Sequence, residues 1–156
     1  MAKIKLGKRP ENFAPVPVTF PMPDGTEGVV NVTYKYRTRK EFGAYIDELI
    51  AQATDSAQAE VKAEIAAHAD AVAAATAAPE GEAKPIPEIK AFSMMELMAK
   101  TSGSNADHLL GAVSSWDMGE PLKHETFEQL SDELPAGAIA MISAYRKLCQ
   151  EGRLGN

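Results

Sequence analysis

The sequence predicts an α+β fold that is mostly α, with an N-terminal β-hairpin packed on a helix and a C-terminal bundle of short helices. Three observations lead to this prediction. An alternating, β-branched stretch surrounds a turn sequence near the N-terminus. Apolar residues then recur at helical spacing, and the C-terminal part repeats this spacing between glycine and proline breaks.

The hairpin is expected over residues 15–37. Pro-Asp-Gly at residues 23–25 is a turn sequence, because proline presets φ and glycine accepts a positive φ. Pro17 demotes the first strand to the edge of a sheet, since proline has no N–H to donate to a neighbouring strand. Four residues of the second strand share one face at period two: Val30, Val32, Tyr34 and Tyr36.

A helix is expected to follow over residues 39–52. Thr38 and Glu41 match a capping box, in which each side chain bonds the backbone N–H of the other residue. One apolar stripe runs along this helix: Phe42, Tyr45, Ile46, Leu49 and Ile50. We expect the stripe to cover one face of the hairpin, because a bare two-stranded hairpin is marginally stable in water.

Residues 55–90 differ in composition from the rest of the chain. Alanine supplies 12 of the 22 residues from 57 to 78, which favours a helix but offers little area to bury. A thin apolar stripe is formed by Val61, Ile65 and Val72. This stretch is either a long, weakly packed helix or an insertion that partly melts. Residues 79–90 hold three prolines and a glycine, a composition typical of a linker.

The C-terminal part, residues 91–156, is expected to be helical and to form one compact domain with residues 1–54. Its first stretch, residues 91–99, is compatible with a short helix or with an extended segment. Gly103 is expected to break that segment.

Three helices are expected in the remainder. The first covers residues 105–116, begins at a cap-like sequence at residues 104–107 and stops at Gly119. The second covers residues 124–133, and the third begins at Pro135, a favoured first residue of a helix. The residues expected to face inward are Leu109, Leu110 and Val113 in the first, Phe127, Leu130 and Leu134 in the second, and Ile139, Ile142, Tyr145 and Leu148 in the third.

The charge distribution argues against nucleic acid as a partner. The formal net charge of −6 divides into +5 for residues 1–40 and −11 for residues 41–156, an acidic majority that argues against a nucleic-acid binder. The helix over 124–133 carries four acidic residues and no Lys or Arg, so phosphate would be repelled.

No apolar run approaches the ~20 residues of a membrane span. The N-terminus lacks the apolar core of a secretory signal.

No catalytic or metal-binding pattern stands out. The histidines, at positions 68, 108 and 124, are far apart in sequence, and the single cysteine provides no zinc-site spacing. Cys149 is interpreted as a small buried hydrophobe, since no base marks it as a nucleophile. One cysteine also excludes an internal disulfide, which fits a reducing cytoplasm. We therefore expect no cofactor, no metal and no enzymatic activity.

Two features allow alternative interpretations. Trp116, the only tryptophan, is either a plug at the join of the C-terminal helices or a docking anchor for a partner. The methionines at positions 94, 95, 98 and 118 form either an adaptable binding surface or core filler.

Several short motifs occur in a characteristic order. In the C-terminal half these are Trp116-Asp117, Pro121-Leu122, an acidic amphipathic helix, Leu134-Pro135-Ala136-Gly137-Ala138, Ala144-Tyr145, and an ending with Arg153 and Asn156. In the N-terminal part they are Phe13-Ala14-Pro15, a hairpin ending Tyr34-Lys35-Tyr36-Arg37-Thr38-Arg39, and Glu41-Phe42. Over residues 1–50 and 105–156 the chain resembles the tail assembly chaperones of long-tailed bacteriophages. It departs from that pattern at Lys123, where a Ser or Thr cap is expected.

The resemblance implies a non-enzymatic protein of a phage or prophage. Such chaperones bind the long, hydrophobic tape measure protein, keep it soluble during tail-tube assembly and help to recruit tail-tube subunits. The resemblance also implies a location in the host bacterial cytoplasm and absence from the mature virion. The candidate partner-binding residues are Trp116, Met118, Phe127 and Tyr145, because aromatic residues and methionine dominate contacts of this kind.

One mode of self-association and one alternative function stand beside this expectation. The edge strands of the hairpin offer a way for copies of the chain to pair, which would give a homo-oligomer. A structural tail or head–tail joining component is the alternative function, and it predicts a larger, β-rich core.

Overall fold

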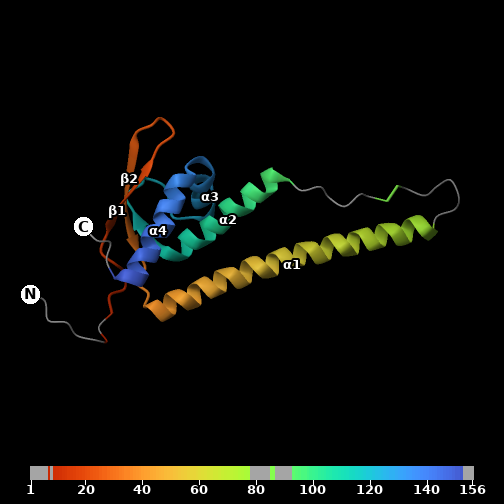
Figure 1. Ribbon diagram of the computed structural model, residues 1–156, viewed down its shortest axis with the longest axis horizontal. Coiled ribbons are helices and arrows are strands. Elements are labelled where there is room, and N and C mark those ends of the chain that lie inside the picture. Colours follow the sequence, from red (N-terminus) through yellow and green to blue (C-terminus); the bar gives the residue numbers. More distant parts are fainter. Residues whose placement is uncertain (1–6, 8, 78–84, 87–92, 153–156) are drawn as a thin grey trace, which may run out of the picture. The chain divides into compact units, whose positions relative to one another are not determined.

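The computed structural model describes residues 7, 9–77, 85–86 and 93–152. Its elements in chain order are β1 (Val16–Pro21), β2 (Glu27–Tyr34), α1 (Arg39–Ala77), α2 (Met94–Ala112), β3 (Val113–Trp116), α3 (His124–Glu133) and α4 (Pro135–Glu151). All of them except β3 are labelled in Figure 1. The prediction of a mostly-α α+β fold is confirmed, since the described residues form a small antiparallel sheet among longer helices.

The chain divides into two compact units. Unit 1 comprises residues 1–46 and 95–156, and unit 2 comprises residues 47–94. The boundary therefore falls inside the predicted N-terminal segment 1–54, part-way along α1. Most of the predicted linker at 79–90 lies outside the described residues.

The predicted hairpin is present as β1 and β2. Their antiparallel register runs from Val16 opposite Val32 to Pro21 opposite Glu27. Gly25 has φ 84°, the positive value that the Pro-Asp-Gly turn requires. β1 lies at the edge of the sheet, as Pro17 predicted.

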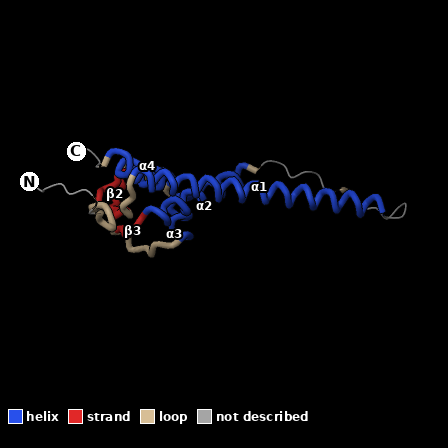
Figure 2. The backbone as a smooth tube through the Cα atoms, turned by 90° about the horizontal axis from the view of Figure 1, so that it is seen from below, coloured by secondary structure: helices blue, strands red, loops and turns tan. Residues whose placement is uncertain are grey.

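A third strand was not predicted. The helix expected over residues 105–116 ends at Ala112, and β3 pairs antiparallel with the free side of β2, with Trp116 opposite Val32. Figure 2 shows β2 and β3 among the strands of the sheet. The prediction of helix was wrong because pairing with a distant strand satisfies the backbone of a short stretch whose valine and tryptophan suit a pleated surface.

The helix before β3 also begins earlier than predicted. α2 runs from Met94 through Gly103 without interruption, so neither the predicted break nor the predicted start at residues 104–107 is correct. The side chain of Asn105 bonds the Ser131 hydroxyl at 2.8 Å instead of capping a helix. Glycine inside a helix costs about 1 kcal/mol, a small penalty for a helix that buries Leu109 in the core. Leu110, expected inward, is exposed.

α4 covers the inner face of the sheet, where the helix at 39–52 was expected. It lies along β1, and Gly137 makes this approach possible, because a Cβ there would lie 3.1 Å from the ring of Phe20. Tyr34 stacks on Tyr145 with ring centroids 5.3 Å apart. The Tyr34 hydroxyl donates to the backbone carbonyl of Met141 at 2.9 Å. A glycine-containing helix fits this position better than the bulky stripe of α1.

The helix α1 begins as predicted and continues well past its predicted end. The Thr38 N–H donates to Glu41 Oε2 at 2.8 Å and the Glu41 N–H donates to Thr38 Oγ1 at 3.3 Å, which confirms the capping box. The helix reaches Ala77, so the alanine-rich stretch is helical to that point. Phe42 is the one residue of α1 that is buried, and Ile50 at the end of the predicted stripe is 59% exposed.

The last two helices match their predicted bounds. α3 has Lys123 at its N-cap with no side-chain hydrogen bond, and α4 begins at Pro135. The inward set predicted for α4 was partly wrong, since Tyr145 and Leu148 are buried but Ile139 is 59% exposed. Residues 139 and 148 are nine positions apart, which is about 180° around an α-helix.

Candidate partner-binding site

Trp116 lies at the end of β3, on the inner face of the sheet. Its ring packs on Phe127 of α3, with centroids 4.9 Å apart, and its indole Nε1–H donates to the Glu120 carbonyl at 2.8 Å. The side chain is half-buried. Trp116 therefore closes the core between β3 and α3 rather than between two helices, and it keeps one side accessible.

Asp117 holds the segment after β3 against the hairpin. Its carboxylate accepts hydrogen bonds from the backbone N–H of Asn31 at 2.9 Å and from the Asn31 side-chain amide at 2.7 Å. The Asp117 N–H donates to the Asn31 carbonyl at 3.2 Å. These bonds, the side-chain bond first, lower the pKa of the Asp117 carboxyl below its usual value. The Trp-Asp pair thus combines a core contact with a clamp on β2.

The segment between Asp117 and α3 adds further apolar surface. Met118 and Leu122 are half-buried against the core of unit 1. Phe127, which follows them on α3, is fully buried, and Leu130, one turn later, is 6% exposed. The accessible apolar groups of this region are therefore those of Trp116, Met118 and Leu122.

Tyr145 belongs to a second aromatic cluster, in the interior of unit 1. Its ring lies within 5.3–6.4 Å, centroid to centroid, of four other rings: Tyr34, Phe42, Tyr45 and His108. Arg37 Nη1 donates to the Tyr145 hydroxyl at 2.5 Å and to the Gly111 carbonyl at 3.1 Å. The Arg37 guanidinium also lies 4.1 Å from the centre of the Tyr45 ring. Burial raises the pKa of the Tyr145 phenol, so this group remains neutral.

His108 carries an unusual buried nitrogen beside this cluster. Its Nε2 is shielded from solvent and is the one such side-chain atom, among the described residues, that has no hydrogen-bond partner. Burial, followed by the positive charges of Arg146 and Arg37, lowers the pKa of His108 to about 4. His108 is therefore a neutral, packed side chain at neutral pH.

The four predicted partner-binding residues are not equivalent in the structure. Trp116 and Phe127 are brought together, whereas Tyr145 lies in the separate cluster around Tyr34. Phe127 and Tyr145 are fully buried, so a partner reaches only Trp116 and Met118 in this conformation. Partner binding by these residues stays a prediction.

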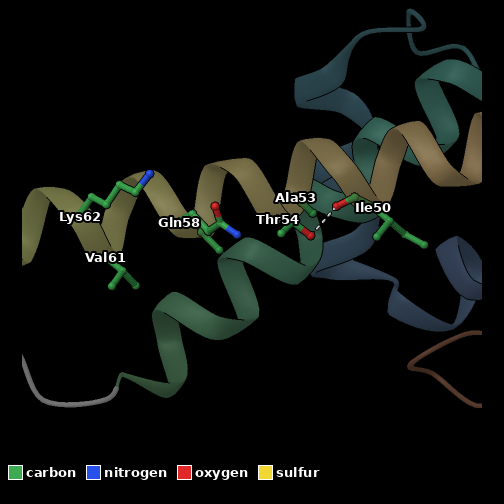
Figure 3. Close-up of a pocket in the computed structure, with 7 residues that line it drawn as sticks. Ile50, Ala53, Thr54, Gln58, Val61 and Lys62 are labelled. Carbon is green, nitrogen blue, oxygen red and sulfur yellow. Dashed lines mark hydrogen bonds between the residues drawn. The ribbon is translucent and has the colours of Figure 1, made fainter.

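An exposed apolar surface on α1 was not among the candidate sites predicted from the sequence. On the unit 2 part of α1, Ile50, Val61 and Ile65 are 59%, 56% and 64% exposed. An open depression of about 620 Å³ lies along the same face (Figure 3), lined by Ile50, Ala53, Thr54, Ala57, Gln58, Val61 and Lys62. The signal was visible as the thin apolar stripe, but the sequence alone did not tell whether another element covers it.

The four methionines that were interpreted either as a binding surface or as core filler differ in their exposure. Met94, Met95 and Met98 are exposed at the start of α2, while Met118 is half-buried. Cys149 is buried, as predicted, and burial raises the pKa of its thiol.

Within residues 7, 9–77, 85–86 and 93–152, no three His, Cys, Asp or Glu side chains come together in a way that suits a metal ion. None of the helices in these ranges has the length and apolar character needed to cross a membrane.

Comparisons with known proteins place the chain in a family. Searches of curated proteins and of solved structures each gave no match. A family model described as phage tail assembly chaperone matches residues 1–156, which is the whole chain and includes its alanine-rich middle. The chain belongs to the phage tail assembly chaperone family.

Proposed function

We propose that this chain binds the tape measure protein of its phage and keeps that protein soluble while the tail tube assembles. The observation that carries the proposal is the match of the whole chain to the phage tail assembly chaperone family. A chaperone of this kind holds its client through non-covalent contacts, so we propose that the chain catalyses no reaction.

Surface chemistry supports a client with apolar segments. The half-buried Trp116 and Met118 offer aromatic and thioether groups, which contribute strongly to protein interfaces. The exposed apolar residues of α1 add a second surface. The net charge of −6 would keep a complex with a sticky client in solution.

The proposal extends to where the protein acts. We place it in the host bacterial cytoplasm, where the client is synthesised, and outside the mature virion. Tail-tube subunits are the second proposed partner, because the client must be handed to the growing tube.

Co-expression tests the proposal. The tagged chain is expressed together with the tape measure protein encoded by the same phage, and soluble client is measured after affinity capture. We expect soluble, co-purifying client only in the presence of the chain. An insoluble client, together with this chain in purified phage particles, would instead establish a structural tail component.

Variants of the Trp116 region locate the contact. Trp116→Ala and Met118→Ala are expected to reduce client capture several-fold, and Thr19→Ala, on the exposed side of β1, serves as the matched control. Thermal melting shows whether each variant is folded, and Met118→Ala decides the outcome if Trp116→Ala is not. Capture that is unchanged in folded variants would remove these residues from the client contact.

A further inference from the structure

The exposed part of α1 has an internal repeat of 11 residues. Ile50, Val61 and Val72 are each 11 positions apart, and a second row with the same spacing consists of Thr54, Ile65 and Thr76. Eleven residues make close to three turns of an α-helix, so residues at this spacing point in nearly the same direction. The two rows lie side by side, since they are offset by four positions.

The threonines in the second row fit an apolar surface. The Thr54 hydroxyl donates to the Ile50 carbonyl at 2.8 Å, and the Thr76 hydroxyl donates to the Val72 carbonyl at 2.8 Å. Because both hydroxyls are satisfied on their own helix, the methyl groups continue the apolar row between the larger side chains. We call the surface formed by these two rows the α1 stripe: Ile50, Thr54, Val61, Ile65, Val72 and Thr76.

The shape of the α1 stripe calls for large side chains from a partner. Between Ile50 and Val61, the small residues Ala53 and Ala57 line the depression of about 620 Å³ (Figure 3). This open space would accommodate several bulky side chains, such as leucine, methionine or phenylalanine. From Ile50 to Val72 the stripe extends about 33 Å at 1.5 Å per residue. A partner helix whose apolar residues follow the same 11-residue repeat would match the stripe over that length.

The charge of this region selects among possible partners. Residues 47–77 contain six Asp or Glu and one Lys, a balance of −5. A second copy of the chain would bring an equal negative charge to the interface and be repelled. A helix with Lys or Arg beside its apolar residues would be attracted, most strongly at low ionic strength.

We propose that the α1 stripe docks a partner α-helix that carries bulky apolar residues at an 11-residue repeat and Lys or Arg along their flanks. The proposal rests on the proposed function, because it assigns helical segments of the client to this surface. It differs from the Trp116 region, which belongs to unit 1.

Peptide titration tests the proposal directly. The probe is a fluorescent synthetic helix of three 11-residue repeats with leucine in the two apolar rows and lysine on the flanks. A twin peptide carries glutamate in place of every lysine. The full chain is titrated into each by fluorescence anisotropy, and the lysine peptide is expected to bind at least ten-fold more tightly than its twin. Equal affinities would overturn the charge assignment.

Two matched variants test the surface. Val61→Asp places a carboxylate in the α1 stripe, whereas Ala63→Asp adds the same charge about 200° further around the exposed helix. We expect Val61→Asp to weaken binding of the lysine peptide at least ten-fold and Ala63→Asp to change it less than two-fold. Circular dichroism verifies that both variants keep the helix. Equal effects of the two variants would overturn the proposal.

Two further measurements separate the other outcomes. Sedimentation equilibrium of the chain alone is expected to show a monomer. A dimer that Val61→Asp abolishes would instead show that the α1 stripe binds a second copy of the chain. If the wild-type chain and Val61→Asp solubilise the tape measure protein equally, the proposed function stands and this inference fails. If the wild-type chain does not solubilise it, the proposed function fails, and the peptide titrations still decide whether the stripe binds a helix.

Discussion

The helices α4 and α1 differ in how they use their residues. α4 has 17 residues and buries seven of them, while α1 has 39 residues and buries Phe42 alone. Small residues are frequent in both helices, yet Gly137 and Ala138 in α4 are buried and the alanines at residues 57–67 of α1 are exposed. In α4 the small side chains let the helix approach the sheet closely.

The contrast teaches that the two helices are stabilised by different forces. α4 is held by tertiary packing, which accounts for most helical stability in proteins. The unit 2 part of α1 depends on the intrinsic preference of alanine for the helix and on its length. Unfolding of unit 1 should therefore be cooperative, whereas residues 47–77 should melt gradually. Substitutions in matched positions can break or sharpen this distinction.

The largest effect is expected from Tyr145→Ala. This change removes a fully buried ring from the centre of the aromatic cluster, and it should lower the free energy of unfolding by about 3–5 kcal/mol. Ile139→Ala, on the exposed side of the same helix, is the control and should change it by less than about 0.5 kcal/mol. Urea denaturation monitored by tryptophan fluorescence measures both. Comparable losses in the two variants would show that α4 is not packed as described.

Features formed by residues close in sequence were predictable, whereas those formed by residues far apart in sequence were not. The turn at Gly25 and the capping box of Thr38 and Glu41 involve residues within a few positions of one another, and both were predicted. β3 was missed because its partner Val32 is distant in sequence. The local sequence of Val113 to Trp116 continues a helical apolar pattern, and pairing with the free side of β2 decides in favour of a strand.

The candidate site shows the same division. From the sequence, Trp116 was either a plug at the join of two helices or a docking anchor. In the structure it lies on β3, opposite Val32, and packs on Phe127 of α3, so the join is between a strand and a helix. The hydrogen-bonded clamp between Asp117 and Asn31 joins two segments that no local pattern connects. Three residues of the α1 stripe, Val61, Ile65 and Val72, were identified in the sequence, whereas their exposure depends on the tertiary structure.

A second prediction compares two glycines in α2. A Cβ at Gly111 would lie 2.6 Å from the hydroxyl oxygen of Tyr45, while nothing lies within 4 Å of a Cβ at Gly103. Gly111→Ala should displace Tyr45 from its hydrogen bond to the His108 carbonyl and destabilise unit 1 by about 2 kcal/mol. Gly103→Ala should stabilise it by about 0.5–1 kcal/mol, because alanine is the better helix former. Thermal and urea unfolding check the signs, and the same sign for both would refute the close packing at Gly111.

A third prediction concerns pH. The pKa of His108 is about 4 in the folded chain and near its usual 6.5 in the unfolded chain, so the unfolded chain takes up the proton first as pH falls. The contribution of neutral His108 to stability is therefore complete above about pH 6.5 and is lost as pH falls from 6.5 towards 4. His108→Leu removes this titration while keeping an apolar side chain.

As pH falls from 7.5 to 5, the free energy of unfolding of the variant should rise by about 1 kcal/mol relative to that of the wild type. This figure is smaller than the shift in the pKa of His108 alone would give, because the side chain is not completely buried and solvent screens its charge. Urea denaturation at the two pH values gives the difference directly. Carboxylates titrate alike in both proteins and cancel. A stability difference that does not change with pH would mean that His108 does not resist protonation in the folded chain.

The smallest effect is expected where α1 is exposed. Ala66→Gly should lower the helical signal of circular dichroism slightly at low temperature, because glycine costs about 1 kcal/mol in a helix. It should leave the cooperative transition of unit 1 unchanged, since Ala66 belongs to unit 2. Ala138→Gly, at a fully buried position of α4, carries the same helix penalty and also loses a packed methyl group, so it should cost unit 1 about 1–2 kcal/mol. If Ala66→Gly shifted the cooperative transition as much as Ala138→Gly, the two units would unfold together, and the difference between a packed helix and a helix stabilised by alanine would disappear.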